Sequence, residues 1–342
     1  MKEIRDRARD LMKGYCRVCP VCDGRVCAGE VPGMGGLGTG RAFRANLEAL
    51  ARLRLNMRLL HDVTAPDTGV TILGRKLSMP VLAAPIGGIS FNMGGKVSEE
   101  DYTKSVIGGC IGQGILGSVG DGVPDFIHQA GNAAIKACGG AGIPFIKPWG
   151  EAELNAKLDK ALSTGADIIG MDVDAAGLVT LKLMGRPVTP KTSEQLRAVI
   201  SRVPGKFILK GILTRADALI AADAGVHAIV VSNHGGRVLE HAPGAAEVLP
   251  EIAAAVKGRV TILADGGVRS GGDVLKLLAL GADAVMIGRP IAVAAIGGLQ
   301  AGVEKYLQQI KSELQSAMVL TGTASVAGVS REILRLMPEP ID

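Results

Sequence analysis

The chain has 342 residues, enough for one large α/β domain or two smaller ones, and 47% of them are hydrophobic while only 3% are aromatic. The core must therefore be built from aliphatic side chains, and 48 glycines scattered among apolar segments are typical of many tight turns between strands and helices. The mild formal charge of +5, without a basic tract carrying interleaved aromatic residues, argues against a nucleic-acid partner.

The N-terminal stretch MKEIRDRARDLMKG is charged and amphipathic, which predicts a helix rather than a secretory signal. The longest apolar run, from Ile291 to Gly298, is far shorter than the roughly 20 residues that span a bilayer. We therefore expect a cytoplasmic protein with no membrane contact.

Four cysteines lie close together in the stretch CRVCPVCDGRVC: Cys16, Cys19, Cys22 and Cys27. In a cytosolic chain this spacing favours a zinc ion, an iron–sulfur cluster or redox exchange over a structural disulfide. Redox pairing (Cys16 with Cys19, or Cys22 with Cys27) and four unlinked thiols are the competing interpretations. The other two cysteines, Cys110 and Cys138, lie in apolar contexts and are predicted to be packing residues.

Two other features of the sequence have ordinary explanations. The segment GMGGLGTG (33–40) is similar to a nucleotide-binding loop but follows no predicted strand, so we expect a flexible connector. His61 and His128 are isolated from other polar motifs, and we expect surface or helix-capping positions for both.

Short apolar runs bounded by turn residues predict eight strands, at 80–85, 114–118, 144–148, 167–172, 206–210, 228–232, 260–265 and 284–288. Helical patterns separate them, for example at 151–165, 215–225 and 270–281, and the last two end at glycines suited to a left-handed C-cap, Gly225 and Gly281. The even spacing predicts an α/β fold: a TIM (β/α)8 barrel with C-terminal helices over 64–342, preceded by a helical, Cys-rich segment over 1–63. A doubly wound sheet is the alternative.

Chemistry-bearing residues follow nearly every predicted strand. In a TIM barrel the active site lies at the C-terminal ends of the strands, so these residues should gather at one face of the molecule. The set is Pro85, Ile86 and Gly87; Ser118; Lys147 and Trp149; Asp172 and Asp174; Lys210; Ser232, His234 and Arg237; Asp265, Gly266, Gly267 and Arg269; and Gly288 with Arg289.

The turns after the seventh and eighth strands, ADGGVRSGGD and MIGRP, predict a phosphate site. Glycine-rich turns at these places present backbone N–H groups to a phosphate, and Arg269 and Arg289 would add charge-assisted contacts. The alternative is that the glycines only form tight turns and the arginines are solvated.

With these motifs in place, the chain resembles the FMN-dependent α-hydroxy acid oxidase and dehydrogenase family, which contains glycolate oxidase and lactate oxidase. The resemblance runs from about Phe43 to Gly298. It is carried by RANLEALARLRLNMRLLHDV (44–63), MPVLAAPIGG (79–88), FILKGILTRADA, VSNHGGRVLEHAPGAAEVLPEI and ILADGGVRSGGDVLKLLALGADAVMIGRP.

The resemblance implies FMN as cofactor, a homo-oligomer such as a tetramer, and oxidation of a small carboxylate such as lactate or glycolate to its 2-oxo acid, with flavin N5 accepting the electrons. His234 would be the catalytic base, Arg237 would bind the substrate carboxylate, and Lys210 would lie at the flavin N1/O2 edge. The remaining implied cofactor contacts are Ala84, Pro85, Ile86, Gly87, Ser118, Lys147, Asp172 and Ser232 around the ring, Asp265 at the ribityl chain or the base, and Gly266, Gly267, Arg269, Gly288 and Arg289 at the phosphate.

Three departures from the family pattern affect the substrate side. The family's N-terminal tyrosine aligns near Arg25, which makes Arg25 a substrate candidate. Lys147 and Trp149 replace a glutamine and a tyrosine on the third strand. The arginine that normally follows the fourth strand is missing, and only Lys182 or Arg186 lies nearby.

These departures keep two alternatives open. One is an FMN enzyme without net oxidation, in the manner of flavin-dependent isopentenyl diphosphate isomerase. The other is a flavin-holding redox protein whose output is the cysteine cluster. The shared loop of His234 and Arg237 favours the hydroxy-acid oxidoreductase, because it provides a base and a carboxylate anchor together.

Overall fold

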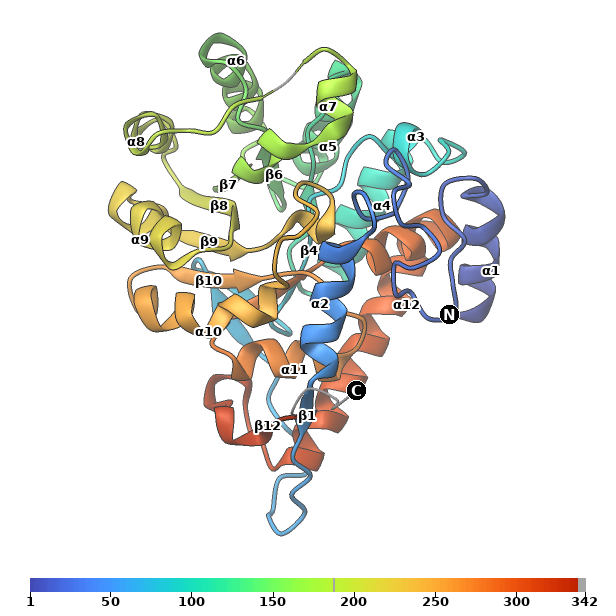
Figure 1. The fold of residues 1–342 in the computed structure, drawn as a ribbon, viewed down its shortest axis with the longest axis vertical. Helices are drawn as coiled ribbons and strands as arrows, with labels where there is room; N and C mark the ends of the chain where they lie inside the picture. Colours follow the sequence, from blue (N-terminus) through green and yellow to red (C-terminus); the bar gives the residue numbers. More distant parts are fainter. Residues whose placement is uncertain (187, 338–342) are drawn as a thin grey trace.

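The computed structural model describes residues 1–186 and 188–337. Its centre is an eight-stranded sheet in the order β4-β11-β10-β9-β8-β7-β6-β5, in which every strand pair is parallel (Figure 1). A parallel bridge between Leu82 of β4 and Leu116, just before β5, joins the two edges. The predicted TIM barrel is confirmed.

All eight predicted strands are present, most of them shortened by one or two residues. They are β4 (Val81–Ala83), β5 (Ser118–Val119), β6 (Ile143–Ile146), β7 (Ile168–Asp172), β8 (Lys206–Ile212), β9 (Ala228–Val231), β10 (Thr261–Ala264) and β11 (Ala284–Ile287). The second strand differs most, because the apolar run at 114–118 predicted it several residues too early.

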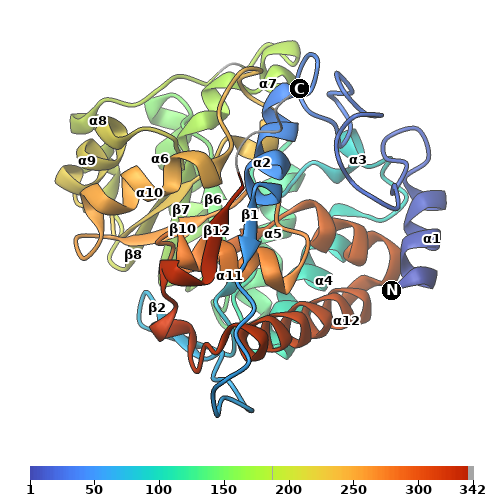
Figure 2. The same ribbon diagram turned by 60° about the horizontal axis from the view of Figure 1, so that its bottom comes forward.

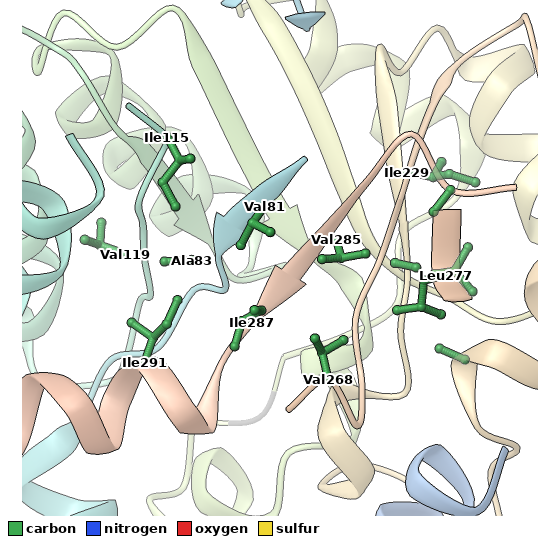
Figure 3. Packing of buried hydrophobic residues seen from close by; sticks show 14 of the residues in the cluster. Val81, Ala83, Ile115, Val119, Ile229, Val268, Leu277, Val285, Ile287 and Ile291 are labelled. Atoms are coloured by element: carbon green, nitrogen blue, oxygen red, sulfur yellow. The ribbon is translucent and has the colours of Figure 1, made fainter. Parts of the chain in front are cut away.

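Alternate residues of the strands enter two separate hydrophobic cores. On β4, Leu82 belongs to the core inside the barrel, while Val81 and Ala83 belong to the layer between strands and helices. Figure 3 shows this outer layer, where Ile287 of β11 lies near Ile291 of the following helix and Val285 lies farther back on the same strand. Successive side chains of a strand point to opposite faces, so a parallel strand buried on both sides is apolar throughout.

Helices surround the barrel (Figures 1 and 2). They are α4 (Glu99–Gly112), α5 (Asp125–Ala137), α6 (Glu151–Leu162), α8 (Ser193–Ser201), α9 (Arg215–Ala224), α10 (Ala245–Val256), α11 (Gly271–Ala279) and α12 (Arg289–Thr321). The three helices predicted by pattern are confirmed, and Gly225 and Gly281 both have the positive φ that their positions require. None of the described helices is long and apolar enough to cross a membrane.

The N-terminal segment is bound to the barrel at several places. Helix α1 (Lys2–Leu11) packs against α12, and α2 (Arg41–Ala51) packs against α10. Strand β1 (Leu53–Leu55) pairs antiparallel with the C-terminal β12 (Leu334–Leu336). The hairpin of β2 (Val70–Ile72) and β3 (Arg75–Leu77) adds Ile72 and Leu77 to the core inside the barrel. The division of the chain at residue 63 stays a prediction.

Three expectations about individual segments are wrong. The glycine-rich stretch at 33–40 is not a loose connector, because Gly33 to Gly36 are buried and their carbonyls accept hydrogen bonds from two arginines. His128 is buried, with its ring within hydrogen-bond reach of the Lys157 carbonyl and the Asn132 amide. Cys138 is exposed at the end of α5, whereas Cys110 is buried in the core as predicted.

The inner core gives a test of the barrel. Leu82 is fully buried, so Leu82→Ala should lower the free energy of unfolding by about 2–5 kcal/mol through lost apolar burial and a cavity. Leu60, which is 95% exposed, is the matched control. Leu60→Ala should change the free energy of unfolding by less than about 0.5 kcal/mol. Chemical denaturation of both variants measures this, and equal stability of the two would contradict the core assignment.

Candidate functional site

A cavity opens at the C-terminal ends of the barrel strands and encloses about 1260 Å³ of atom-free space, part of it open to solvent. Most of the residues predicted from strand ends line it together. They are Ala84, Pro85, Ile86, Gly87, Lys147, Asp172, Lys210, His234, Arg237, Asp265, Gly266, Gly267, Arg269, Gly288 and Arg289. The structure therefore brings residues from β4, β6, β7, β8, β9, β10 and β11 to one site.

The histidine of this site is held by a carboxylate. His234 Nδ1 lies 2.9 Å from Asp174 Oδ1, and Asp174 belongs to the short helix η1 (Val173–Gly177) after β7. Burial alone would raise the pKa of Asp174, but the charges of His234 and Lys210 lower it to about 2. Asp174 is therefore ionised at neutral pH and suited to accept the Nδ1 proton, an arrangement in which Nε2 is the nitrogen left to act as a base.

The backbone of His234 is strained. Its φ of +55° is uncommon for a residue other than glycine and costs on the order of 1–3 kcal/mol. Neighbouring groups impose this conformation: the Ser232 hydroxyl accepts from the His234 N–H, and Asn233 donates to the carbonyls of Ala42 and Pro243. Ser232 and Asn233 are fully buried, so the polar segment after β9 works as a rigid support for the imidazole.

Two lysines form ion pairs with carboxylates beside the histidine. Lys147 Nζ is 3.3 Å from Asp172, and Lys210 Nζ is 3.4 Å from Asp174 and 3.9 Å from Asp265. Burial opposes the charge on Lys210, but the three surrounding carboxylates raise its pKa, so its ammonium group stays charged. Oxygen and nitrogen atoms of Asp172, Asp174 and His234 lie within 4.8 Å of one another, which is close enough to hold a metal ion. Lys147 and Lys210 already neutralise the two carboxylates, however.

Arg237, the predicted carboxylate anchor, is bound to the N-terminal segment. Its Nη1 donates to the carbonyls of Gly33 (2.6 Å) and Gly35 (3.1 Å), and its Nη2 donates to Asn92 Oδ1 (2.9 Å). Burial lowers the pKa of Arg237 to about 10, which still leaves it charged at neutral pH. Asn92 and the glycine carbonyls carried no recognisable signal in the sequence, because their role depends on contacts across the fold.

The other two arginines lie next to Arg237. Arg289 donates to the carbonyls of Met34 and Gly235 and stacks on the Phe43 ring, 4.1 Å from its centre. Burial, with the charges of Arg237 and Arg269, lowers the pKa of Arg289 to about 9. Three guanidinium groups thus share one region without a carboxylate bonded to any of them among the described residues, which favours an anionic ligand.

The cavity has polar atoms that need a partner. Asp265 Oδ1 and Arg269 Nε, both on residues that line the cavity, are buried and have no hydrogen-bond partner among the described residues, although buried polar groups are usually paired. Ser118 Oγ is also without a partner among these residues, but Ser118 does not line the cavity. Gly266 and Gly267 have φ values of +89° and +81°, which allow the turn after β10 to present its backbone to a ligand. A ligand with a phosphate and several hydroxyl groups fits this donor and acceptor set, and FMN is such a ligand.

The remaining substrate candidates lie outside the cavity. Arg25 has an exposed side chain paired with Asp23, Lys182 is exposed, and Arg186 binds Glu153 and stacks on Trp149. The structure gives no support to a substrate role for Arg25. That role was predicted only because Arg25 aligns near the tyrosine of the family.

Trp149 belongs to a buried polar network next to the cavity. Its indole N–H and the Lys157 ammonium group both donate to Asp121, which also accepts the Lys147 backbone N–H. Burial opposes the charge on Asp121, but the two lysines lower the pKa of its carboxyl. The network holds the end of β6 in place. No local sequence pattern indicates it, because Asp121 and Lys157 are far apart in the chain.

The four N-terminal cysteines are unlinked and partly exposed. Cys22 Sγ lies 3.6 Å from Arg269 Nη2. Burial is the main cause that raises the pKa of Cys16, and the thiols of Cys22 and Cys19 add to the rise. Burial and the thiol of Cys22 likewise raise the pKa of Cys27. Cys22 therefore lies beside an arginine of the cavity, and its thiol affects the pKa of both Cys16 and Cys27.

Comparison with known proteins identifies the family. The FMN-dependent dehydrogenase family matches residues 33–104 and 152–336. The 2-hydroxyacid oxidase 2 of Bos taurus is 33% identical over 315 residues, covering 85% of this chain and 88% of that protein. The 4-hydroxymandelate oxidase of Amycolatopsis orientalis is 33% identical over 331 residues, covering 87% of this chain and 90% of that protein. A solved structure of mandelate oxidase has a TM-score of 0.81 and 31% identity, covering 98% of both chains.

These relatives confirm the predicted resemblance and the predicted enzyme class, and they give no support to the isomerase or redox-sensor alternatives. The family match also supports FMN as the ligand that the unpaired polar atoms of the cavity require. The chain belongs to the family of FMN-dependent dehydrogenases that includes the α-hydroxy acid oxidases.

Proposed function

We propose that this protein oxidises a 2-hydroxy acid to the corresponding 2-oxo acid, with His234 as the general base. The observation that carries the proposal is the 2.9 Å contact between His234 and the ionised Asp174 at a cavity that suits FMN. Arg237, three residues after the base on the same loop, adds a guanidinium group beside it.

His234 takes the proton from the substrate hydroxyl. Asp174 accepts the Nδ1 proton, so Nε2 holds the lone pair that a base needs, and the imidazolium that forms is stabilised by the same carboxylate. A positioned general base of this kind contributes about 10²–10⁴-fold to the rate. Oxidation also needs a two-electron acceptor, which is the chemistry that FMN supplies when it is bound.

Arg237 holds the substrate carboxylate. A guanidinium carries five N–H donors, and the bonds to Gly33, Gly35 and Asn92 use three of them. The remaining donors are the strongest available anchor for a carboxylate beside His234, since Arg25, Lys182 and Arg186 lie elsewhere.

Lys210 and Arg269 are proposed to bind the cofactor at its two ends. Lys210 keeps its charge among three carboxylates and would stabilise negative charge on the reduced ring. Arg269, with its unpaired Nε, and the turn at Gly266 and Gly267 would bind the phosphate.

Five large apolar side chains line the cavity: Phe91, Ile127, Leu178, Leu181 and Met184. We propose that they surround the substrate. Apolar walls favour a substrate with an apolar side chain, so among lactate, glycolate and mandelate we expect glycolate, which has no side chain, to be the poorest substrate.

The base is tested by substitution. His234→Ala should slow the anaerobic reduction of bound FMN by a 2-hydroxy acid by about 10²–10⁴-fold, because no other group replaces the imidazole. The matched control is His241→Ala, at an exposed position, which should react at the wild-type rate. Rapid-mixing absorbance at the oxidised flavin band measures both, and a His234→Ala protein as fast as wild type would exclude the assigned base.

The role of Asp174 is tested separately. Asp174→Asn should slow the same reaction by at least about 10-fold and by up to about 10⁴-fold, because a neutral amide fixes neither the tautomer nor the developing charge of His234. Asp167→Asn serves as control, since Asp167 is exposed and pairs with Arg75 at the start of β7. Flavin content and unfolding midpoint establish that both variants are folded. Equal rates for the two variants would show that Asp174 does not assist the base.

The phosphate site is tested by comparing two ligands. Arg269→Ala should raise the FMN dissociation constant about 10- to 100-fold, because a charge-assisted hydrogen bond is lost. The affinity for riboflavin, which has no phosphate, should not change. Arg259→Ala removes a surface arginine paired with Asp223 and is the control. If Arg269→Ala weakened the binding of FMN and of riboflavin equally, a contact between Arg269 and the phosphate would be contradicted.

A further inference from the structure

The segment between α1 and α2, residues 12–40, contains no helix or strand, yet it is folded tightly. Loops of this length without secondary structure are uncommon in compact domains and usually functional. This segment carries Cys16, Cys19, Cys22 and Cys27, and the structure joins none of them in a disulfide. Hydroxy-acid oxidation by the cavity residues uses none of the four.

The cysteine segment is fixed by hydrogen bonds to helix α1 and within the segment itself. Arg9 donates to the carbonyls of Arg17 and Val18, and Arg17 binds Glu30 through two hydrogen bonds of 2.7 Å. Gly24 and Gly29 have positive φ, and a Cβ on Gly24 would lie only 2.3 Å from the Phe43 ring. The backbone is thus shaped for close packing without a cross-link.

Two of the thiols already accept hydrogen bonds of the kind that stabilise metal-bound thiolates. The Val18 N–H donates to Cys16 Sγ at 3.4 Å, and the Arg269 guanidinium lies 3.6 Å from Cys22 Sγ. Hydrogen bonds to sulfur and nearby charge are the means by which proteins adjust thiolate-bound metal centres. The arginines therefore provide a positive environment for an anionic centre.

The arrangement of the thiols favours a cluster over a single ion. Four sulfurs on one zinc ion, at about 2.3 Å each, lie within about 4 Å of one another. Among the described residues, no three of these thiols come within 4.8 Å of one another, whereas Asp172, Asp174 and His234 do. An iron–sulfur cube holds its four cysteine sulfurs farther apart than a single ion does. The sequence C-x₂-C-x₂-C is also the run found in bacterial iron–sulfur proteins.

We propose that Cys16, Cys19, Cys22 and Cys27 bind a four-iron iron–sulfur cluster beside the arginines of the cofactor cavity. The cluster lies next to Arg269, the residue assigned to the phosphate. Its role rests on the proposed function: each 2-hydroxy acid oxidised releases two electrons and two protons. Bound FMN would take up the electron pair, the protons would leave to solvent through His234, and the cluster would pass the electrons singly to an external one-electron acceptor. Such an enzyme behaves as a dehydrogenase.

The test measures metal content and spectrum rather than turnover. Protein purified without oxygen, and protein reconstituted with ferrous iron and sulfide, should contain about four iron and four acid-labile sulfide per chain. Dithionite reduction should give an electron paramagnetic resonance signal. Iron and sulfide at background after reconstitution, zinc in place of iron, or disulfides among the four cysteines in the anaerobic protein would each overturn the proposal.

Substitutions locate the cluster. Cys22→Ser should lose most of the iron and the resonance signal, while Cys138→Ser, at an exposed cysteine outside the segment, should retain both. Cys19→Ser is a second variant in case Cys22→Ser does not fold, and FMN content with circular dichroism establishes folding. Full iron content in folded Cys22→Ser and Cys19→Ser would overturn the assignment. A protein with iron but no hydroxy-acid activity would contradict only the proposed function.

Discussion

Asp174 is the group on which the geometry of the site depends, because it connects residues that follow or belong to three neighbouring strands. It follows β7 and contacts Lys210 of β8 and His234 after β9. The barrel makes this possible, since parallel neighbouring strands deliver their C-terminal residues to the same face. A buried carboxylate is costly unless it is paired, so Asp174 keeps its charge only while both partners stay in place. The same contacts that satisfy Asp174 orient the imidazole.

Once the ion pairs between lysines and carboxylates are set aside, three arginines are the charged groups that remain in the described lining of the cavity. Arg237, Arg269 and Arg289 are bonded mainly to backbone carbonyls, several of them from the N-terminal segment. A carbonyl satisfies a hydrogen bond but does not neutralise a charge, so these arginines remain suited to anions. A phosphate, a substrate carboxylate and an anionic cluster are the three anions that the proposals assign to them. The N-terminal segment is thus part of the site and not only an extension of the barrel.

The sequence was sufficient for the barrel and for most of the cavity lining. Eight apolar runs at even spacing predict a TIM barrel, and that fold requires residues such as Lys147, Lys210 and His234 to meet at one face. Contacts between distant segments were not predictable. Nothing local shows that Gly33 and Gly35 accept from Arg237, or that Asp121 pairs with Lys157. Arg25 was assigned by alignment to a missing tyrosine, and the exposed turn around it directs the side chain to Asp23 instead.

The central claim is that this cavity couples oxidation of a 2-hydroxy acid to reduction of bound FMN. The most direct measurement is a single anaerobic turnover with FMN-loaded protein and mandelate or lactate, in which flavin bleaching and 2-oxo acid are quantified together. We expect a fixed ratio of product to electrons taken up, with two electrons for each 2-oxo acid formed. Flavin that stays fully oxidised with every acid of the panel, or bleaching without a 2-oxo acid, would contradict it.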